Sequence, residues 1–155
     1  MWYILNTTLT RFINGNKMST QPAGYSGTPL DKKLGMKPGF NIQLVNAPDY
    51  YFDLFTQLPS DMHIDEDDGP KDLIHFFTSQ ESELITMLPI LREQIKPSGM
   101  IWVSWPKKSS KMKTGITEDT IRNFALKISL VDIKVCAVDE TWSGLKLVIP
   151  VKDRV

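Results

Sequence analysis

Apolar and polar residues alternate along this chain with two different periods, and each change of period marks a boundary between expected elements. Short runs rich in β-branched and aromatic residues predict strands at residues 40–45, 62–65, 71–79, 100–105, 131–138 and 145–151. Apolar residues at helical spacing predict helices at residues 28–35, 49–58, 79–96 and 117–128. The order of these elements predicts an α/β fold.

The expected helix ends carry residues that commonly cap helices. Thr28, Ser79 and Thr117 stand at predicted N-termini, while Gly35 and the Pro97–Gly99 stretch stand at predicted C-termini. Alternating strands and helices favour a mostly parallel sheet with helices on both faces. The loop before the last strand is too short for a crossover, so that strand should run antiparallel to its predecessor.

Composition and charge exclude several classes of protein. The 155 residues carry 18 basic and 18 acidic side chains, so no global charge favours nucleic acid or an anionic membrane. Cys136 is the single cysteine, which excludes a disulfide framework and a cysteine-rich zinc site. We expect a cytoplasmic protein with residues 1–23 as a disordered extension and 24–155 as one domain.

A candidate site follows from the rule that open parallel sheets bind ligands at the carboxyl ends of their strands. Polar and aromatic residues follow three of the predicted strands, and a cluster of lysines continues after residues 100–105. A small anionic ligand, its charge neutralised by lysine and its flat part packed on an indole, would fit such an edge. The candidate residues are Asn46, Trp105, Lys107, Lys108, Asp139, Glu140, Trp142 and Ser143.

Each candidate also has a purely structural interpretation. A lysine run in a loop is usually solvated, and tryptophans usually pack in or around the core. Adjacent carboxylates such as Asp139 and Glu140 point in opposite directions in extended chain and favour a turn role. His75 and Cys136 lie inside predicted strands, where a structural role is expected. The acidic run 65–68 does not match the spacing of a calcium loop, and we predict no metal site.

Residues 71–106 resemble the second half of a class I S-adenosylmethionine (SAM)-dependent methyltransferase. The resemblance rests on a strand, a helix, the turn Ile95–Gly99 and an apolar strand, followed by a closing strand pair. It implies a Rossmann-like, methyltransferase-like fold with SAM as a possible cofactor. The front half departs from that family because no glycine occurs between Gly39 and Gly69. Backbone approach to the cofactor after the first strand is hard without glycine, which argues against the usual SAM pose.

A second resemblance covers residues 24–151. The motifs GYSGTPLDKKLGMKPG, LVNAP, WVSWPKK, TEDTIRN and VCAVDETWSGLKLV resemble an uncharacterised family of short bacterial proteins, to which no activity is assigned. The first motif places Tyr25 and Ser26 before a capped helix. We expect this segment to fold over the candidate edge, so that both residues supply hydroxyls to it.

These patterns leave three functions open. We expect a non-catalytic binding domain for a small anionic ligand or a protein partner, without nucleic acid or membrane. The alternative is a SAM-dependent transferase with a rearranged cofactor site. A third possibility is an interaction module whose tryptophan-rich edge contacts a protein. The identity of the ligand or cofactor stays open at this level.

Overall fold

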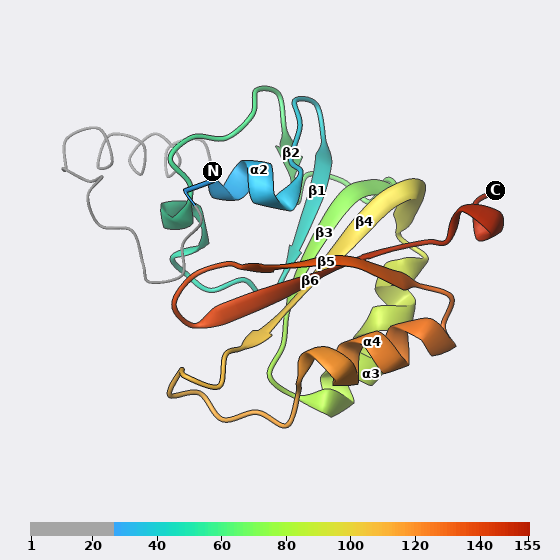
Figure 1. The fold of residues 1–155 in the computed structure, drawn as a ribbon. Helices are drawn as coiled ribbons and strands as arrows, with labels where there is room; N and C mark the ends of the chain where they lie inside the picture. The colour runs from blue at the N-terminus through green and yellow to red at the C-terminus, as the bar shows by residue number, and fades with distance from the viewer. Residues whose placement is uncertain (1–26) are drawn as a thin grey trace.

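A six-stranded mixed sheet forms the centre of the fold in the computed structural model, which describes residues 27–155 (Figure 1). The elements in chain order are α2 (Leu30–Leu34), β1 (Asn41–Val45), the 3-10 helix η2 (Tyr51–Leu54), β2 (His63–Ile64), β3 (Lys71–Phe77), α3 (Glu81–Arg92), β4 (Ile95–Pro106), α4 (Glu118–Lys127), β5 (Val131–Ala137), β6 (Trp142–Val148) and the 3-10 helix η3 (Val151–Asp153).

The strand order is β2-β1-β3-β4-β6-β5. The strands from β2 to β4 pair in parallel, whereas β6 is antiparallel to both β4 and β5. The predicted class, a Rossmann-like sheet that is mostly parallel with an antiparallel last strand, is therefore confirmed. The chain order reverses direction across the sheet between β1 and β3, which makes that position the topological switch point.

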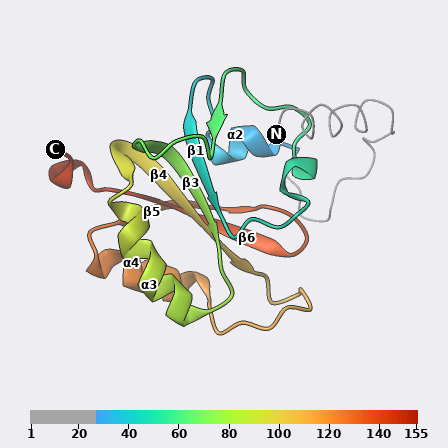
Figure 2. The same ribbon diagram turned by 180° about the vertical axis from the view of Figure 1, so that it is seen from behind.

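Helices lie on both faces of the sheet, as predicted (Figures 1 and 2). α3 and α4 cover one face, here called the α3/α4 face, through Leu84, Leu88 and Ile121. α2 and η2 cover the other, here called the α2 face, through Leu34 and Tyr51. Strand β3 is buried from both sides because Ile74 and Phe76 belong to the first core, and Leu73 and Phe77 to the second.

Several predicted boundaries are wrong. The cap residues of α2 and α3 are Pro29 and Gln80 instead of Thr28 and Ser79. Residues 49–58 form only the short η2, and Pro97–Gly99 belongs to β4 instead of ending a helix. Glycine is required at position 99 because a Cβ there would lie 2.8 Å from the carbonyl oxygen of Lys71. The register between β3 and β4 shifts next to this contact.

Strand β5 forms one edge of the sheet and carries an irregularity. Its pairing with β6 shifts register between Asp132 and Lys134, so that Ile133 is an extra residue in the strand. Ile133 and Val135 are 52% and 45% exposed. This edge is therefore apolar in part and bent by a bulge.

The predicted N-terminal extension, Tyr25 and Ser26 lie outside the described residues 27–155. Within those residues, every helix is too short or too polar to cross a lipid bilayer.

Candidate functional site

At the edge where the parallel strands end, the loops that follow β1 and β4 meet the β5–β6 hairpin, and the loop after β1 also contacts the end of β3. The backbone N–H of Lys107 donates to the carbonyl oxygen of Thr141 at 2.7 Å. The side-chain amide of Asn46 donates to the carbonyl oxygen of Phe77 at 3.3 Å. The structure thus brings together the strand ends named from the sequence, although not all of their side chains.

A cavity of about 1270 Å³ lies against the lysine loop, defined here as residues 107–117 between β4 and α4. Side chains of charged, hydroxyl and apolar residues line this lysine cavity; they include Lys107, Lys108, Lys111, Lys113, Ser143 and Trp105. The sequence favours Lys107 and Lys108, which adjoin the strand end, over Lys111 and Lys113, yet all four lysines line the cavity.

Both ends of the lysine loop are held by specific contacts. The hydroxyl of Ser110 donates to the carbonyl oxygen of Lys107 at 2.8 Å and closes a turn at the start of the loop. Thr114 donates its hydroxyl to the carbonyl oxygen of Ser79 at 2.7 Å, and Ile116 is buried in the α3/α4 core. The middle of the loop, which carries most of the lysines, is exposed between these anchors.

Arg122 on α4 is ion-paired to two carboxylates of the lysine cavity without lining the cavity itself. Glu118 and Asp119 are lining carboxylates at the start of α4. Arg122 forms ion pairs with both, at 2.6 Å to Asp119, and a third with Asp132 at 3.0 Å. Within residues 27–155, no ion pair involves any of the four lysines of the loop. The four lysines therefore have no carboxylate partner among the described residues, while the nearby carboxylates share the single positive charge of Arg122.

Thr117 begins α4 as the sequence predicts. Its hydroxyl accepts from the backbone N–H of Thr120 at 3.2 Å, and the hydroxyl of Thr120 accepts in return from the backbone N–H of Thr117 at 3.1 Å. This capping box fixes the end of the lysine loop and directs the positive end of the helix dipole toward the cavity wall.

The two candidate tryptophans lie on opposite faces of the sheet. Trp105 pairs with Ser143 and belongs to the α3/α4 core, whereas Trp142 pairs with Pro106 and belongs to the α2 core. They are only 8% and 7% exposed. Trp142 packs edge-on against Phe77 with ring centroids 5.1 Å apart. The two indoles therefore share no single site.

Asp139 has the turn role that its sequence position favours. Its carboxylate accepts from the backbone N–H groups of Thr141 and Trp142 at 2.8 and 2.7 Å. Glu140 is exposed. Tyr50 interacts with this hairpin, and burial followed by its hydrogen bond to Asp139 raises the pKa of the phenol. Tyr50 thereby links the loop after β1 to the hairpin, a contact that no local sequence pattern predicts.

Polar side chains connect the two strands at the topological switch point. The amide of Asn46 donates to Glu83 Oε2 at 3.0 Å, and the hydroxyl of Thr78 donates to Glu83 Oε1 at 2.5 Å. This switch-point network, consisting of Asn46, Thr78 and Glu83, occupies the crevice where such sheets bind ligands. Asn46 itself has a φ of +58°, a conformation that asparagine tolerates better than most residues. It supplies the left-handed turn without glycine.

Two side chains that could take part in chemistry have structural surroundings: His75 is fully buried, and Cys136 is partly buried against the α2 core. His75 lies with Nδ1 2.9 Å from the hydroxyl of Tyr51 and Nε2 2.8 Å from the hydroxyl of Ser104. Burial lowers the pKa of His75 to about 3, so the ring is neutral at ordinary pH. Burial also raises the pKa of Cys136, which disfavours the reactive thiolate. The structural interpretation of both residues agrees with this placement.

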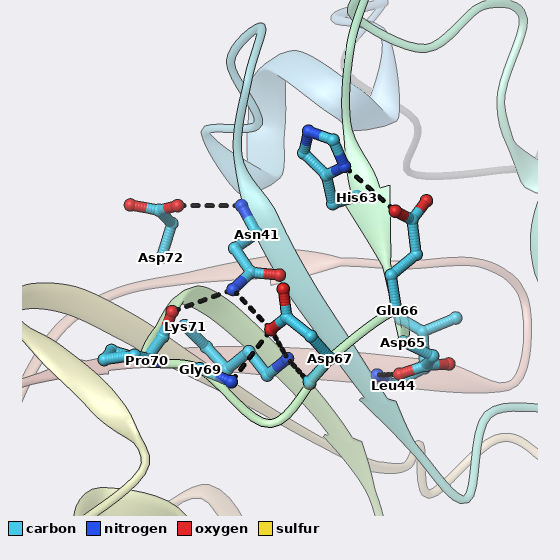
Figure 3. A network of polar contacts seen from close by, with 10 residues as sticks. All are labelled: Asn41, Leu44, His63, Asp65, Glu66, Asp67, Gly69, Pro70, Lys71 and Asp72. Carbon is cyan, nitrogen blue, oxygen red and sulfur yellow. Dashed lines mark hydrogen bonds and ion pairs between the residues drawn. The ribbon is translucent and has the colours of Figure 1, made fainter.

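The acidic run after β2 is tied to its own backbone and to neighbouring strands (Figure 3). Asp65 accepts from the N–H of Leu44 at 2.9 Å, and Asp67 accepts from the N–H of Gly69 at 2.8 Å. The hydrogen bond from Gly69, followed by that from Asn41, lowers the pKa of Asp67. Within residues 27–155, no group of His, Cys, Asp and Glu is arranged to hold a metal ion.

Comparison with known proteins identifies the fold but no family. No protein-family model matches the chain, and no curated protein matches it. A proposed methyltransferase from Thermoplasma acidophilum aligns with a TM-score of 0.51 at 8% identity, over 74% of this chain and 70% of that one. Magnesium protoporphyrin IX methyltransferase from Synechocystis PCC 6803, with bound S-adenosylhomocysteine (SAH), aligns at 0.50 and 8% identity, over 96% and 83% of the chains.

A protein of the NADB-Rossmann superfamily from Streptococcus agalactiae aligns with a TM-score of 0.50 at 10% identity, over 85% and 70% of the chains. At such low identity these similarities establish a shared fold and nothing about chemistry. This chain therefore has the fold of class I methyltransferases, with a methyltransferase-like sheet whose lysine cavity lies at the carboxyl end of β4.

Proposed function

We propose that this protein is a non-catalytic binding domain for a small anionic ligand, which it holds in the lysine cavity. One observation carries the proposal: four lysines without carboxylate partners line a cavity whose own carboxylates are occupied by Arg122. An anion in that cavity would gain the attraction of all four ammonium groups. Lys107 and Lys108, next to the strand end, would make the closest contacts, and Ser143 would add a hydroxyl.

The rest of the predicted site takes supporting roles in this proposal. Asp139 and Trp142 shape the hairpin beside Lys107, and Asn46 locks the neighbouring strand end. We propose that residues 24–155 form the binding domain and that the chain belongs, over residues 24–151, to an uncharacterised bacterial family. Nucleic acid and membrane are not expected partners because the overall charge is balanced.

The test is a titration of the full chain with inorganic pyrophosphate, followed by calorimetry and thermal unfolding. Ligand at 100 times its dissociation constant should add about 2.7 kcal/mol of stability. The double variant Lys107→Gln/Lys108→Gln should abolish binding and leave the free protein as stable as before, since exposed charges contribute little. The matched control is Lys127→Gln, an exposed lysine at the other end of α4. Unchanged binding in the double variant, or a large loss of stability, would reject the site.

The second candidate is a SAM-dependent transferase, and the fold comparisons support it better than the first. Two of the structures named above are described as methyltransferases, and one contains SAH. Asn46 and Asp65, which follow β1 and β2, both have positive φ and stand at strand ends near the switch point. Against this candidate, the switch-point network joins Asn46 to Glu83 across the crevice.

A thermal-shift titration with SAH distinguishes the two candidates. For a transferase, saturating SAH should raise the unfolding midpoint by roughly 5–10 °C. In that case Asn46→Gly, which removes the cross-strand amide but keeps the turn, should tighten SAH binding. If millimolar SAH shifted the unfolding midpoint of neither the wild type nor Asn46→Gly, the anion-binding domain would be the surviving candidate.

A further inference from the structure

The aromatic surface near the lysine cavity determines what kind of anion fits there. Of the aromatic residues within 27–155, only Trp105 lines the cavity, and it is 8% exposed because its indole is packed in the α3/α4 core. Trp142 belongs to the opposite face. Neither ring offers a free face on which a nucleobase or another flat group could stack.

The apolar part of the cavity comes from Met112, Pro106 and Ile116. Met112 is 42% exposed at the middle of the loop, whereas Pro106 and Ile116 are buried. A flexible thioether chain gives a small and adaptable contact but no platform. The exposed lining is otherwise made of ammonium and hydroxyl groups and of the carboxylates of Glu118 and Asp119, which are ion-paired to Arg122.

The distribution of positive charge points to more than one anionic group. Lys107 and Lys108 stand at the start of the loop, beside the hairpin, while Lys111 and Lys113 follow the turn closed by Ser110. The cavity volume of about 1270 Å³ exceeds the range of about 300–1,000 Å³ typical of small-molecule pockets. A single phosphate would leave most of that space, and part of the charge, unused.

We infer that the ligand of the lysine cavity is a compact polyanion with two or more linked phosphate groups and without a stacking ring. This inference rests on the proposed function. Linked phosphates of this kind occur in inorganic polyphosphates and in phosphorylated sugars, and both share the chemistry that ammonium and hydroxyl groups recognise.

The experiment compares ligands that differ in one property at a time, using the full chain and calorimetric titration at fixed salt. Inorganic phosphate, pyrophosphate and triphosphate vary the number of anionic groups. ATP adds a ribose and a base to the triphosphate, and adenosine supplies the base alone. Fructose bisphosphate tests the sugar-borne source. A short single-stranded DNA tests the macromolecular alternative.

Affinity should rise about tenfold or more from phosphate to triphosphate. ATP should bind no more tightly than triphosphate, and adenosine should not bind. The pairs Lys107→Gln/Lys108→Gln and Lys111→Gln/Lys113→Gln should each weaken triphosphate binding, whereas Lys127→Gln should not. A preference of fructose bisphosphate over pyrophosphate, or the reverse, identifies the source of the phosphates.

Three results would overturn the inference while leaving anion binding intact. These are equal affinities for phosphate and triphosphate, binding of ATP or adenosine more than about tenfold tighter than triphosphate, and tighter binding of the DNA. Failure of every anion to bind would instead reject the proposed function, and the inference with it.

Discussion

Tyr51 and His75 share a hydrogen bond inside the core, with 2.9 Å between the phenol oxygen and Nδ1, and both side chains are buried. Ser104 occupies the other ring nitrogen. The imidazole therefore has a hydrogen-bond partner on each side. In the neutral ring one nitrogen donates and the other accepts, and a hydroxyl can meet either need. Protonation would place an unpaired charge in an apolar environment.

This arrangement predicts a loss of stability in mild acid. The pKa of His75 is about 3 in the folded protein and 6.5 in the unfolded chain. Between these values the unfolded state binds the extra proton, so stability falls as the pH drops below 6.5. The expected loss is about 2 kcal/mol from pH 6.5 to pH 5, at about 1.4 kcal/mol per pH unit.

Urea unfolding at pH 7, 6 and 5 would measure this slope. His75→Gln should flatten it, whatever its effect on stability at pH 7. His63→Gln is the control, because the exposed ring of His63 donates a hydrogen bond to Glu66 that raises its pKa and acts in the opposite direction. If stability fell equally with pH in the wild type and in His75→Gln, the loss of stability in acid could not come from His75.

Arg122→Gln should weaken anion binding although Arg122 does not line the lysine cavity. The substitution frees Glu118 and Asp119 to neutralise the lysines opposite them. We expect the dissociation constant of pyrophosphate to rise roughly three- to tenfold. Asp132→Asn is the matched control, since it removes the third ion pair of Arg122 without releasing the lining carboxylates. A similar loss of affinity in both variants would indicate a general disturbance of α4.

Gly99→Ala should destabilise the protein by about 1–3 kcal/mol, because the new methyl group would meet the carbonyl oxygen of Lys71 at 2.8 Å. Gly115→Ala provides the comparison, since no atom lies within 4 Å of its expected Cβ. Chemical denaturation of the two variants would measure the difference. A neutral Gly99→Ala would mean that β3 and β4 separate easily at their starting ends.

Lys146→Gln should stabilise the protein. Lys146 lies directly opposite Lys134 on the neighbouring strand, and burial, then Lys134 and Lys37, lower its pKa. Like charges in such a pair are unfavourable by roughly 0.2–1 kcal/mol. Thermal unfolding in low salt should show a higher midpoint for the variant, with a smaller difference at high ionic strength. A lower midpoint at low salt would show that the aliphatic stem of Lys146 matters more than its charge.

Local sequence patterns were sufficient for the sheet and for some helix ends. The nearly continuous apolar run within residues 71–77 reflects a strand buried on both faces, and Thr117 caps α4 with its own side chain. Gly35 ends α2 in the left-handed conformation that glycine favours. These features depend on residues close together in the chain, where spacing and stereochemistry carry the information.

The parts of the site that the sequence did not reveal depend on distant partners. Asn46 and Glu83 meet across the switch point although 37 positions separate them. The separation of Trp105 and Trp142 onto opposite faces follows from the antiparallel register of β4 and β6. No local period encodes that register, and a shift of one residue would have put both indoles on one face.

The bulge at Ile133 has a consequence for the behaviour of this protein at high concentration. A straight edge strand with exposed Ile and Val side chains would offer its free backbone groups to another molecule and seed open-ended stacking of sheets. The extra residue in β5 breaks the even spacing that such stacking needs, and Lys134 adds a charge beside it. The molecule can thus leave this edge uncovered and still resist joining its neighbours into fibres.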